Sequence, residues 1–264
     1  MPVDRRPNHF RTSFDRAADD YDAARPGYPP GLVADIVTLA ALPSPARILE
    51  VGCGTGQATL PFARRGDHLI CLDIGAALLA IARHKFAAYP HVHFHHAAFE
   101  TWPAPPDAFD LIMSATAFHW IAPEIGYPKA AALLKATGSL AIFVNEHRPS
   151  APEFAADLYE IERRIVPGWP DPRTPPDLHA GIAETAATIT ATGLFAPVVV
   201  RTFPWTQVYT TAAYLRLLNT YSNYRNLDEP TRTQLLRAIA DLIDQRYGGT
   251  VTKSYLAVLF LAHK

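Results

Sequence analysis

Short apolar runs alternate with amphipathic stretches along the first 145 residues. The runs contain few polar side chains, which is typical of parallel strands buried on both faces of a sheet. We expect strands over residues 46–51, 68–73, 92–95, 109–114 and 138–145. The intervening stretches carry apolar positions at helical spacing, and we expect helices over residues 31–42, 55–65, 76–87 and 124–136. This alternation predicts a doubly wound α/β sheet. Pro61 removes a backbone donor from the second helix, so we expect either a loose first turn or a late start of this helix.

Helical patterns dominate the chain beyond residue 145. We expect helices over residues 152–165, 177–193, 211–221 and 229–247, and strands over 197–209 and 251–262, the last one antiparallel. Residues 146–176 and 208–248 are interpreted as a helical cap, and residues 177–207 and 249–264 as the remainder of the core that 46–145 begins. Aromatic and cationic cap residues are candidates to line a pocket, with simple packing as the alternative for each: Trp169, Tyr209, Tyr221, Tyr224, Arg148, Arg216 and Arg225.

Composition narrows the class of protein. The chain has 264 residues, 49% of them hydrophobic, which is ample for a buried core. Its net charge of −1 gives no global field that would favour nucleic acid or an anionic membrane. Cys53 and Cys71 suggest neither a disulfide framework nor a metal site, so a reducing cytoplasm fits best. No apolar run is long enough for a membrane span or a signal peptide, and we expect a soluble protein.

The chain is organised around the stretch Glu50-Val51-Gly52-Cys53-Gly54-Thr55-Gly56, which follows an apolar run. A strand that ends in alternating glycines makes a tight turn whose backbone N–H groups a ligand can approach closely. The dinucleotide fingerprint G-x-G-x-x-G needs glycine or alanine at position 57 or 59, where this chain has Gln57 and Thr59. The stretch is therefore a cofactor cradle without the NAD pattern.

Asp73 ends the second apolar run, seventeen residues after Gly56. A carboxylate at this place can accept hydrogen bonds from two ribose hydroxyls. The alternative is that Asp73 merely caps the helix that follows. Its distance from the glycines favours the ribose interpretation.

The E-V-G-C-G-T-G stretch followed by Leu72-Asp73 resembles the first two motifs of class I S-adenosylmethionine-dependent methyltransferases. Phe109-Asp110-Leu111-Ile112 and Phe118-His119-Trp120-Ile121 are similar to their motif after the fourth strand. The resemblance implies a Rossmann-like seven-stranded sheet whose last strand is antiparallel, with S-adenosylmethionine as cofactor. It places Glu50, Gly52, Gly54, Gly56, Asp73 and Ser114 among the cofactor-binding residues.

The N-terminal segment F-D-R-A-A-D-D-Y-D-A-A-R-P-G-Y-P resembles that of trans-aconitate methyltransferase-like proteins. Ser13 is a candidate N-cap for its helix. The resemblance implies that residues 1–45 fold over the cofactor and that Tyr21 and Arg25 contact its methionine end. The alternative is that Tyr21 packs in the core and Arg25 stays solvated or caps the helix.

Adenine recognition departs from the family pattern. Ala98 stands where many relatives have an aspartate, so adenine is expected to depend on the backbone N–H of Phe99 and on apolar walls. His119 is the candidate general base, with packing at a helix start as the alternative. The chain lacks the Asn/Asp-Pro-Pro-Tyr/Phe motif, which disfavours methylation of nucleic-acid bases. His91, His93, His95 and His96 lack companion ligands at metal spacing, and we expect no metal site.

These patterns predict a methyltransferase that passes a methyl group to a small molecule by in-line displacement. A carboxylic acid and a natural-product hydroxyl are both candidate acceptors, and oligomeric state is left open. Two alternatives stand beside this hypothesis: a non-catalytic module that binds S-adenosylmethionine or S-adenosylhomocysteine, and an NAD(P)-dependent oxidoreductase. An open cavity beside residues 114–120 would favour the enzyme, and a filled one would favour the binding module.

Overall fold

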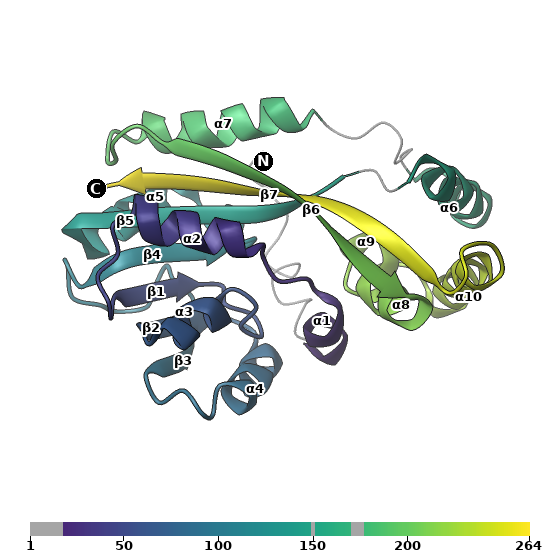
Figure 1. The fold of residues 1–264 in the computed structure, drawn as a ribbon, viewed down its shortest axis with the longest axis horizontal. Helices are drawn as coiled ribbons and strands as arrows, with labels where there is room; N and C mark the ends of the chain where they lie inside the picture. The colour runs from purple at the N-terminus through teal and green to yellow at the C-terminus, as the bar shows by residue number, and fades with distance from the viewer. Residues whose placement is uncertain (1–17, 149–150, 170–176) are drawn as a thin grey trace.

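The computed structural model describes residues 18–148, 151–169 and 177–264 (Figure 1). The expected N-cap, Ser13, lies outside these ranges. Seven strands form one sheet in the order β3-β2-β1-β4-β5-β7-β6. The strands are β1 (Arg47–Val51), β2 (His68–Asp73), β3 (Val92–His96), β4 (Phe109–Ala115), β5 (Leu134–His147), β6 (Val199–Thr210) and β7 (Thr250–His263). Strand β7 is antiparallel to both neighbours and the other pairings are parallel, which confirms the predicted doubly wound sheet with an antiparallel last strand.

Helices cover both faces of the sheet. The helices of the core are α1 (Ala18–Ala24), α2 (Pro30–Leu39), α3 (Thr59–Arg65), α4 (Ala76–Lys85), a 3₁₀ turn η3 (Phe118–Trp120), α5 (Pro123–Leu133) and α7 (Leu178–Ala191). Those of the C-terminal third are α6 (Pro152–Ile165), α8 (Thr211–Asn219), α9 (Ser222–Arg225) and α10 (Glu229–Arg246). Helix α3 begins at Thr59, later than residue 55, because the missing N–H of Pro61 is tolerated only within a first turn.

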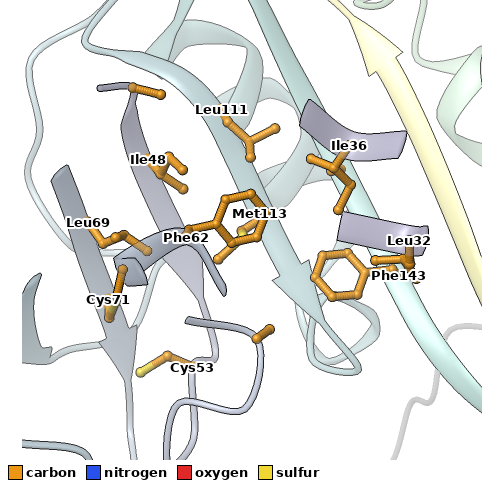
Figure 2. Packing of buried hydrophobic residues seen from close by; sticks show 14 of the residues in the cluster. Leu32, Ile36, Ile48, Cys53, Phe62, Leu69, Cys71, Leu111, Met113 and Phe143 are labelled. Atoms are coloured by element: carbon orange, nitrogen blue, oxygen red, sulfur yellow. The ribbon is translucent and has the colours of Figure 1, made fainter. Parts of the chain in front are cut away.

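Two apolar layers sandwich the sheet. On one face Leu32 and Ile36 of α2 and Phe62 of α3 pack against Met113 and Phe143 of the strands, as Figure 2 shows. On the other face α5 and the C-terminal part of α7 cover β4, β5 and β7. Burial of these side chains is the main stabilising contribution, at about 1.5–3 kcal/mol for each large apolar side chain. The two layers fix the carboxyl ends of the parallel strands at one edge of the sheet, the edge that faces the cap.

A third apolar cluster lies beyond that edge. Helices α6, α8, α9 and α10 gather around the far ends of β6 and β7 (Figure 1). Three of the tyrosines in this region, Tyr209, Tyr214 and Tyr224, are buried in the cluster itself. The cap therefore has its own core. In the described part of the chain, no helix combines the length and apolar character needed to cross a lipid bilayer.

Candidate functional site

The glycine loop, residues 52–56, follows β1 directly and is bonded to the end of the neighbouring strand β2. The N–H groups of Gly52 and Cys53 both donate to the carbonyl of Leu72, at 2.8 and 3.0 Å. Gly52 and Gly54 have φ of 74° and 56°, in the left-handed region that side chains disfavour. A Cβ on Gly52 would collide with Ala117, and one on Gly54 would lie 3.3 Å from the ring of Tyr21. Glycine is thus required here because another element approaches the backbone closely.

Gly56 has a different environment. A Cβ on this residue would collide with the ring of Phe86, which lies just past the end of α4. The third glycine of the motif therefore makes room for the core. Its predicted cofactor role stays a prediction.

Asp73 holds the loop from the end of β2. Its Oδ2 accepts from the N–H of Gly54 and its Oδ1 from the N–H of Gly75, both at 2.8 Å. Helix α4 has no side-chain N-cap bond, and its N-cap residue is Gly75 rather than Asp73. A carboxylate can accept about four hydrogen bonds, and Asp73 lines the cavity above the loop. The carboxylate can therefore organise the loop and accept hydroxyls from a ligand at the same time.

We call the space above the loop the glycine-loop cavity. It encloses about 880 Å³, its open mouth included, and it is bounded by α1, the ends of β1, β2 and β4, and the turns that follow β3 and β4. Seven of the residues expected at the site line it: Tyr21, Arg25, Gly52, Gly54, Asp73, Phe99 and His119. Ser114 lies behind it, fully buried, and its hydroxyl donates to the carbonyl of Val51 at 2.8 Å.

Glu50 faces a smaller cavity beside the first one. This side cavity is also lined by Arg25, Tyr28, Gly52 and His147. Glu50 is fully buried, and its Oε2 accepts from the hydroxyl of Thr59 at 2.6 Å. No residue in the described part of the chain forms a hydrogen bond with its Oε1. Burial raises the pKa of this carboxyl to about 8, against the smaller opposing effect of the bond from Thr59. An unpaired buried oxygen of this kind is a ready partner for a cationic group of a ligand.

Arg25 joins the site to the cap. Its Nε donates to the hydroxyl of Thr220 at 3.0 Å, and another guanidinium nitrogen donates to the carbonyl of the same residue at 3.2 Å. The guanidinium lies 5.2 and 5.3 Å from the ring centroids of Tyr21 and Tyr221, within cation–π range. Burial raises the pKa of the Tyr21 phenol, although the charge of Arg25 opposes this. Helix α1 is thereby fixed between the glycine loop and α8.

The turn after β4 carries backbone strain. Thr116 has φ of 56°, and its N–H donates to the carbonyl of Phe143 at 2.8 Å. Its hydroxyl lies 2.8 Å from that of Tyr28. A β-branched residue held in the left-handed region costs about 1–3 kcal/mol, and such strain clusters at functional sites. His119 follows this turn in η3 and lines two cavities, the glycine-loop cavity and a larger apolar one under α7.

His147 is a site residue that the sequence analysis missed. It ends β5 and lines both the side cavity and the apolar cavity under α7. Its ring centroid lies 5.2 Å from that of Tyr221 and 5.5 Å from that of Tyr255. Desolvation by the surrounding protein lowers the pKa of His147, and the nearby charges of Lys253 and Arg25 lower it further. The imidazole is therefore neutral at neutral pH. Its position at the carboxyl end of a parallel strand was the available signal.

Comparison with known proteins agrees with this geometry. Residues 48–138 match the model of a family described as methyltransferase domain. An uncharacterized methyltransferase-like protein of Schizosaccharomyces pombe is 30% identical over 141 residues, 53% of this chain and 54% of that protein. The chain thus spans about half the length of this curated relative, and the same holds for a Mycobacterium tuberculosis methyltransferase, also uncharacterized, which is 30% identical over 133 residues.

Solved structures share the whole fold. A candidate type II methyltransferase from Anaeromyxobacter dehalogenans superposes with a TM-score of 0.66 at 20% identity, over 90% of this chain and 97% of that one. The Haemonchus contortus phosphoethanolamine N-methyltransferase 2, solved with phosphomonomethylethanolamine and S-adenosylhomocysteine, gives a TM-score of 0.55 at 15% identity, over 95% of this chain and 57% of that one. The resemblance to class I S-adenosylmethionine-dependent methyltransferases is confirmed: residues 48–138 match the methyltransferase domain model, and the solved structures share the fold.

Proposed function

We propose that this chain transfers a methyl group from S-adenosylmethionine to a small-molecule acceptor. The observation that carries the proposal is the pair of carboxylates flanking the glycine loop. On one side, Glu50 has a buried oxygen with which no described residue forms a hydrogen bond, and on the other, Asp73 lines the glycine-loop cavity while it holds the loop through Gly54 and Gly75. S-adenosylmethionine has an ammonium group at one end and a ribose diol near the middle, so its two polar features match these two positions.

The remaining walls suit the rest of the cofactor. Leu72, Ile74, Leu78 and Phe99 give the glycine-loop cavity an apolar side, which a flat adenine ring can pack against. The guanidinium of Arg25 lines both the glycine-loop cavity and the side cavity, where it would meet the carboxylate of the methionine end. Phe99 and Arg25 already belong to the cofactor-binding set expected from the sequence, and Leu72, Ile74 and Leu78 extend it.

The bound cofactor supplies a methyl group already activated by the positive charge on sulfur. The residues of this chain then have to align the acceptor and keep water out. Tyr21 of α1 and the adjoining Arg25 form one wall of the glycine-loop cavity, and hydrogen bonds from Arg25 to Thr220 hold this wall against the cap. His119 and His147 stand where the cofactor cavities meet the apolar cavity under α7. His119 is in place to take a proton from an acceptor that must lose one.

The cavities favour the enzyme over the two alternatives. Space beside Thr116, Ala117 and His119 is open and leads toward a second cavity, as an acceptor requires and a binding module does not. An NAD(P) pyrophosphate laid over the glycine loop would approach the carboxylate of Asp73, which holds the loop through the N–H of Gly54, and like charges repel at such distances.

Calorimetric titration tests the proposal. We expect S-adenosylmethionine and S-adenosylhomocysteine to bind and NADH not to bind. Asp73→Ala should weaken binding of both sulfur compounds by about tenfold or more, since hydrogen bonds to a charged group are worth about 1.5–3 kcal/mol. Preference for NADH, or binding of neither sulfur compound, would overturn the proposal.

Asp110→Ala is the matched control. The carboxylate of Asp110 also accepts a backbone N–H, that of Arg47 at 2.8 Å, but it lies at the opposite end of the sheet from the cavity. Its loss should lower stability with no change in cofactor affinity. Equal weakening of binding by both substitutions would assign the effect of Asp73 to folding rather than to contact with the ligand.

A further inference from the structure

A large apolar cavity lies between the sheet and α7. We call it the α7 cavity. It encloses about 1740 Å³, its open mouth included, against about 880 Å³ for the glycine-loop cavity. Its walls include Ile142 and Val144 of β5 and Val258 and Phe260 of β7. On the α7 side, the small residues Ala180, Gly181, Thr185 and Thr188 line the cavity beside the larger Leu178 and Ile182. Small side chains on that face leave unfilled the space that a leucine or phenylalanine would occupy.

The α7 cavity meets the cofactor cavities at two histidines. His119 lines both the α7 cavity and the glycine-loop cavity, and His147 lines both the α7 cavity and the side cavity. A molecule seated in the α7 cavity can therefore extend one end toward the point where the methionine end of the cofactor would lie. This position makes the α7 cavity the candidate acceptor site.

Charge selects among acceptors. The charged side chains lining the described part of the α7 cavity are carboxylates, those of Glu146, Asp177 and Glu184, and neither lysine nor arginine is among these lining residues. Asp177 is already engaged as the N-cap of α7 and Glu184 is exposed to solvent. Glu146 is half-buried near the His147 end, and no side chain in the described ranges forms a hydrogen bond or ion pair with it. A carboxylic acid would meet like charge there, whereas an amine would gain a partner.

We propose that the acceptor is an apolar amine whose hydrocarbon part fills the α7 cavity and whose ammonium pairs with Glu146. The proposal rests on the proposed methyltransferase function and names its substrate class. It favours a nitrogen acceptor over both the carboxylic acid and the hydroxyl considered from the sequence.

The reaction balances with groups already at hand. The ammonium gives one proton to the carboxylate of Glu146, with which it pairs, and this frees the nitrogen lone pair. That pair forms the new N–C bond as the methyl C–S bond breaks and leaves its electrons on sulfur. The products are a methylated ammonium, a neutral thioether and a protonated Glu146 carboxyl that returns its proton to solvent.

Three probes with one hydrocarbon chain test the proposal: n-octylamine, n-octanol and octanoic acid, each titrated by calorimetry into the protein saturated with S-adenosylhomocysteine. We expect octylamine to bind about tenfold or more tighter than octanol, the effect of one charged hydrogen-bonded pair, and octanoate to bind weakest. With S-adenosylmethionine, mass spectrometry should detect N-methyloctylamine. Tightest binding by octanoate, or no preference among the three, would overturn the assignment.

Variants locate the effect. Glu146→Gln should remove the preference for the amine and leave octanol binding intact, whereas Glu160→Gln, exposed on α6 and outside the cavity lining, should change neither. Thr188→Trp should fill the cavity and abolish binding of all three probes, and Ala183→Trp, on the opposite face of α7, should not. If Glu160→Gln rather than Glu146→Gln removes the preference, the proposed role of Glu146 is wrong.

The same samples separate this proposal from the proposed function. Affinity for S-adenosylhomocysteine is measured before each probe is added. If the wild-type protein does not bind S-adenosylhomocysteine, the methyltransferase assignment itself is refuted. Normal cofactor binding without amine preference would refute the acceptor class alone.

Discussion

Glu50 should release a proton when the cofactor binds. In the free protein burial holds its pKa at about 8, so at pH 6.5 the carboxyl is protonated in roughly 30 molecules of every 31. An α-amino group of ordinary pKa, about 7.7–8.0, is mostly charged at that pH. Pairing that ammonium with the Oε1 of Glu50 favours the ionised carboxylate, and the proton must leave. Binding of S-adenosylhomocysteine should therefore release about one proton, and affinity should rise by up to about tenfold per pH unit from pH 6 toward 8.

Calorimetry in buffers of different ionisation enthalpy measures that proton directly. The wild-type binding enthalpy should depend on the buffer with a slope of about one proton, and Glu50→Gln should reduce the slope to near zero and weaken binding. Glu162→Gln is the control, because Glu162 is a second buried carboxyl whose pKa is raised by burial, but it is bonded to Tyr224 in the cap. It should keep the wild-type slope. A slope near zero in the wild-type protein, or an unchanged slope in Glu50→Gln, would refute the pairing.

Further predictions concern stability and the link to the cap. Glu50 has a pKa of about 8 in the folded protein, against the ordinary value of 4.5 that applies in the unfolded chain. Between these two pH values the folded state holds a proton that the unfolded state has lost, so the free energy of unfolding should fall as pH rises from 4.5 to 8. Urea titrations should show a fall of about 3–4 kcal/mol more in the wild type than in Glu50→Gln across pH 5–8; parallel profiles would contradict the shift. Gly52→Ala should cost about 2–4 kcal/mol in thermal unfolding, through strain and collision, whereas Gly66→Ala, with φ of 87° but open space around it, should cost about 1. Equal losses would show that only backbone strain matters. A double-mutant cycle on Arg25→Ala and Thr220→Val should give a coupling of about 0.5–1.5 kcal/mol, and additive losses would mean that their hydrogen bond contributes nothing.

The order and type of the core elements could be predicted because their signals are local. The apolar run before the glycine loop and the run ending at Asp73 match β1 and β2 to within a residue. Strand β5 extends further than expected, from Leu134 to His147, because Leu134 pairs with Phe109 beyond an irregularity in register. Such an extension depends on a partner strand, and the segment's own sequence does not reveal it.

The site was only partly visible for the same reason. Gly56 is fixed by Phe86, and Arg25 by Thr220, through contacts between segments far apart in the chain. The cap tyrosines were candidates to line an acceptor pocket, with packing as the alternative, and Tyr209 and Tyr224 pack in the apolar cluster of the cap helices. The α7 cavity was missed because an amphipathic pattern predicts which face of a helix packs on the sheet. It does not predict whether the side chains on that face fill the space. The small residues on one face of α7 were the signal for it.

The most direct test of the account is a crystal structure of the chain with S-adenosylhomocysteine bound. We predict that the ribose hydroxyls lie within hydrogen-bond distance of the Asp73 carboxylate and the ammonium within hydrogen-bond distance of the Glu50 Oε1, with sulfur facing His147 and the mouth of the α7 cavity. A ligand bound outside the glycine-loop cavity, or a Glu50 Oε1 left without a partner in the complex, would contradict the assignment of this loop as the cofactor site.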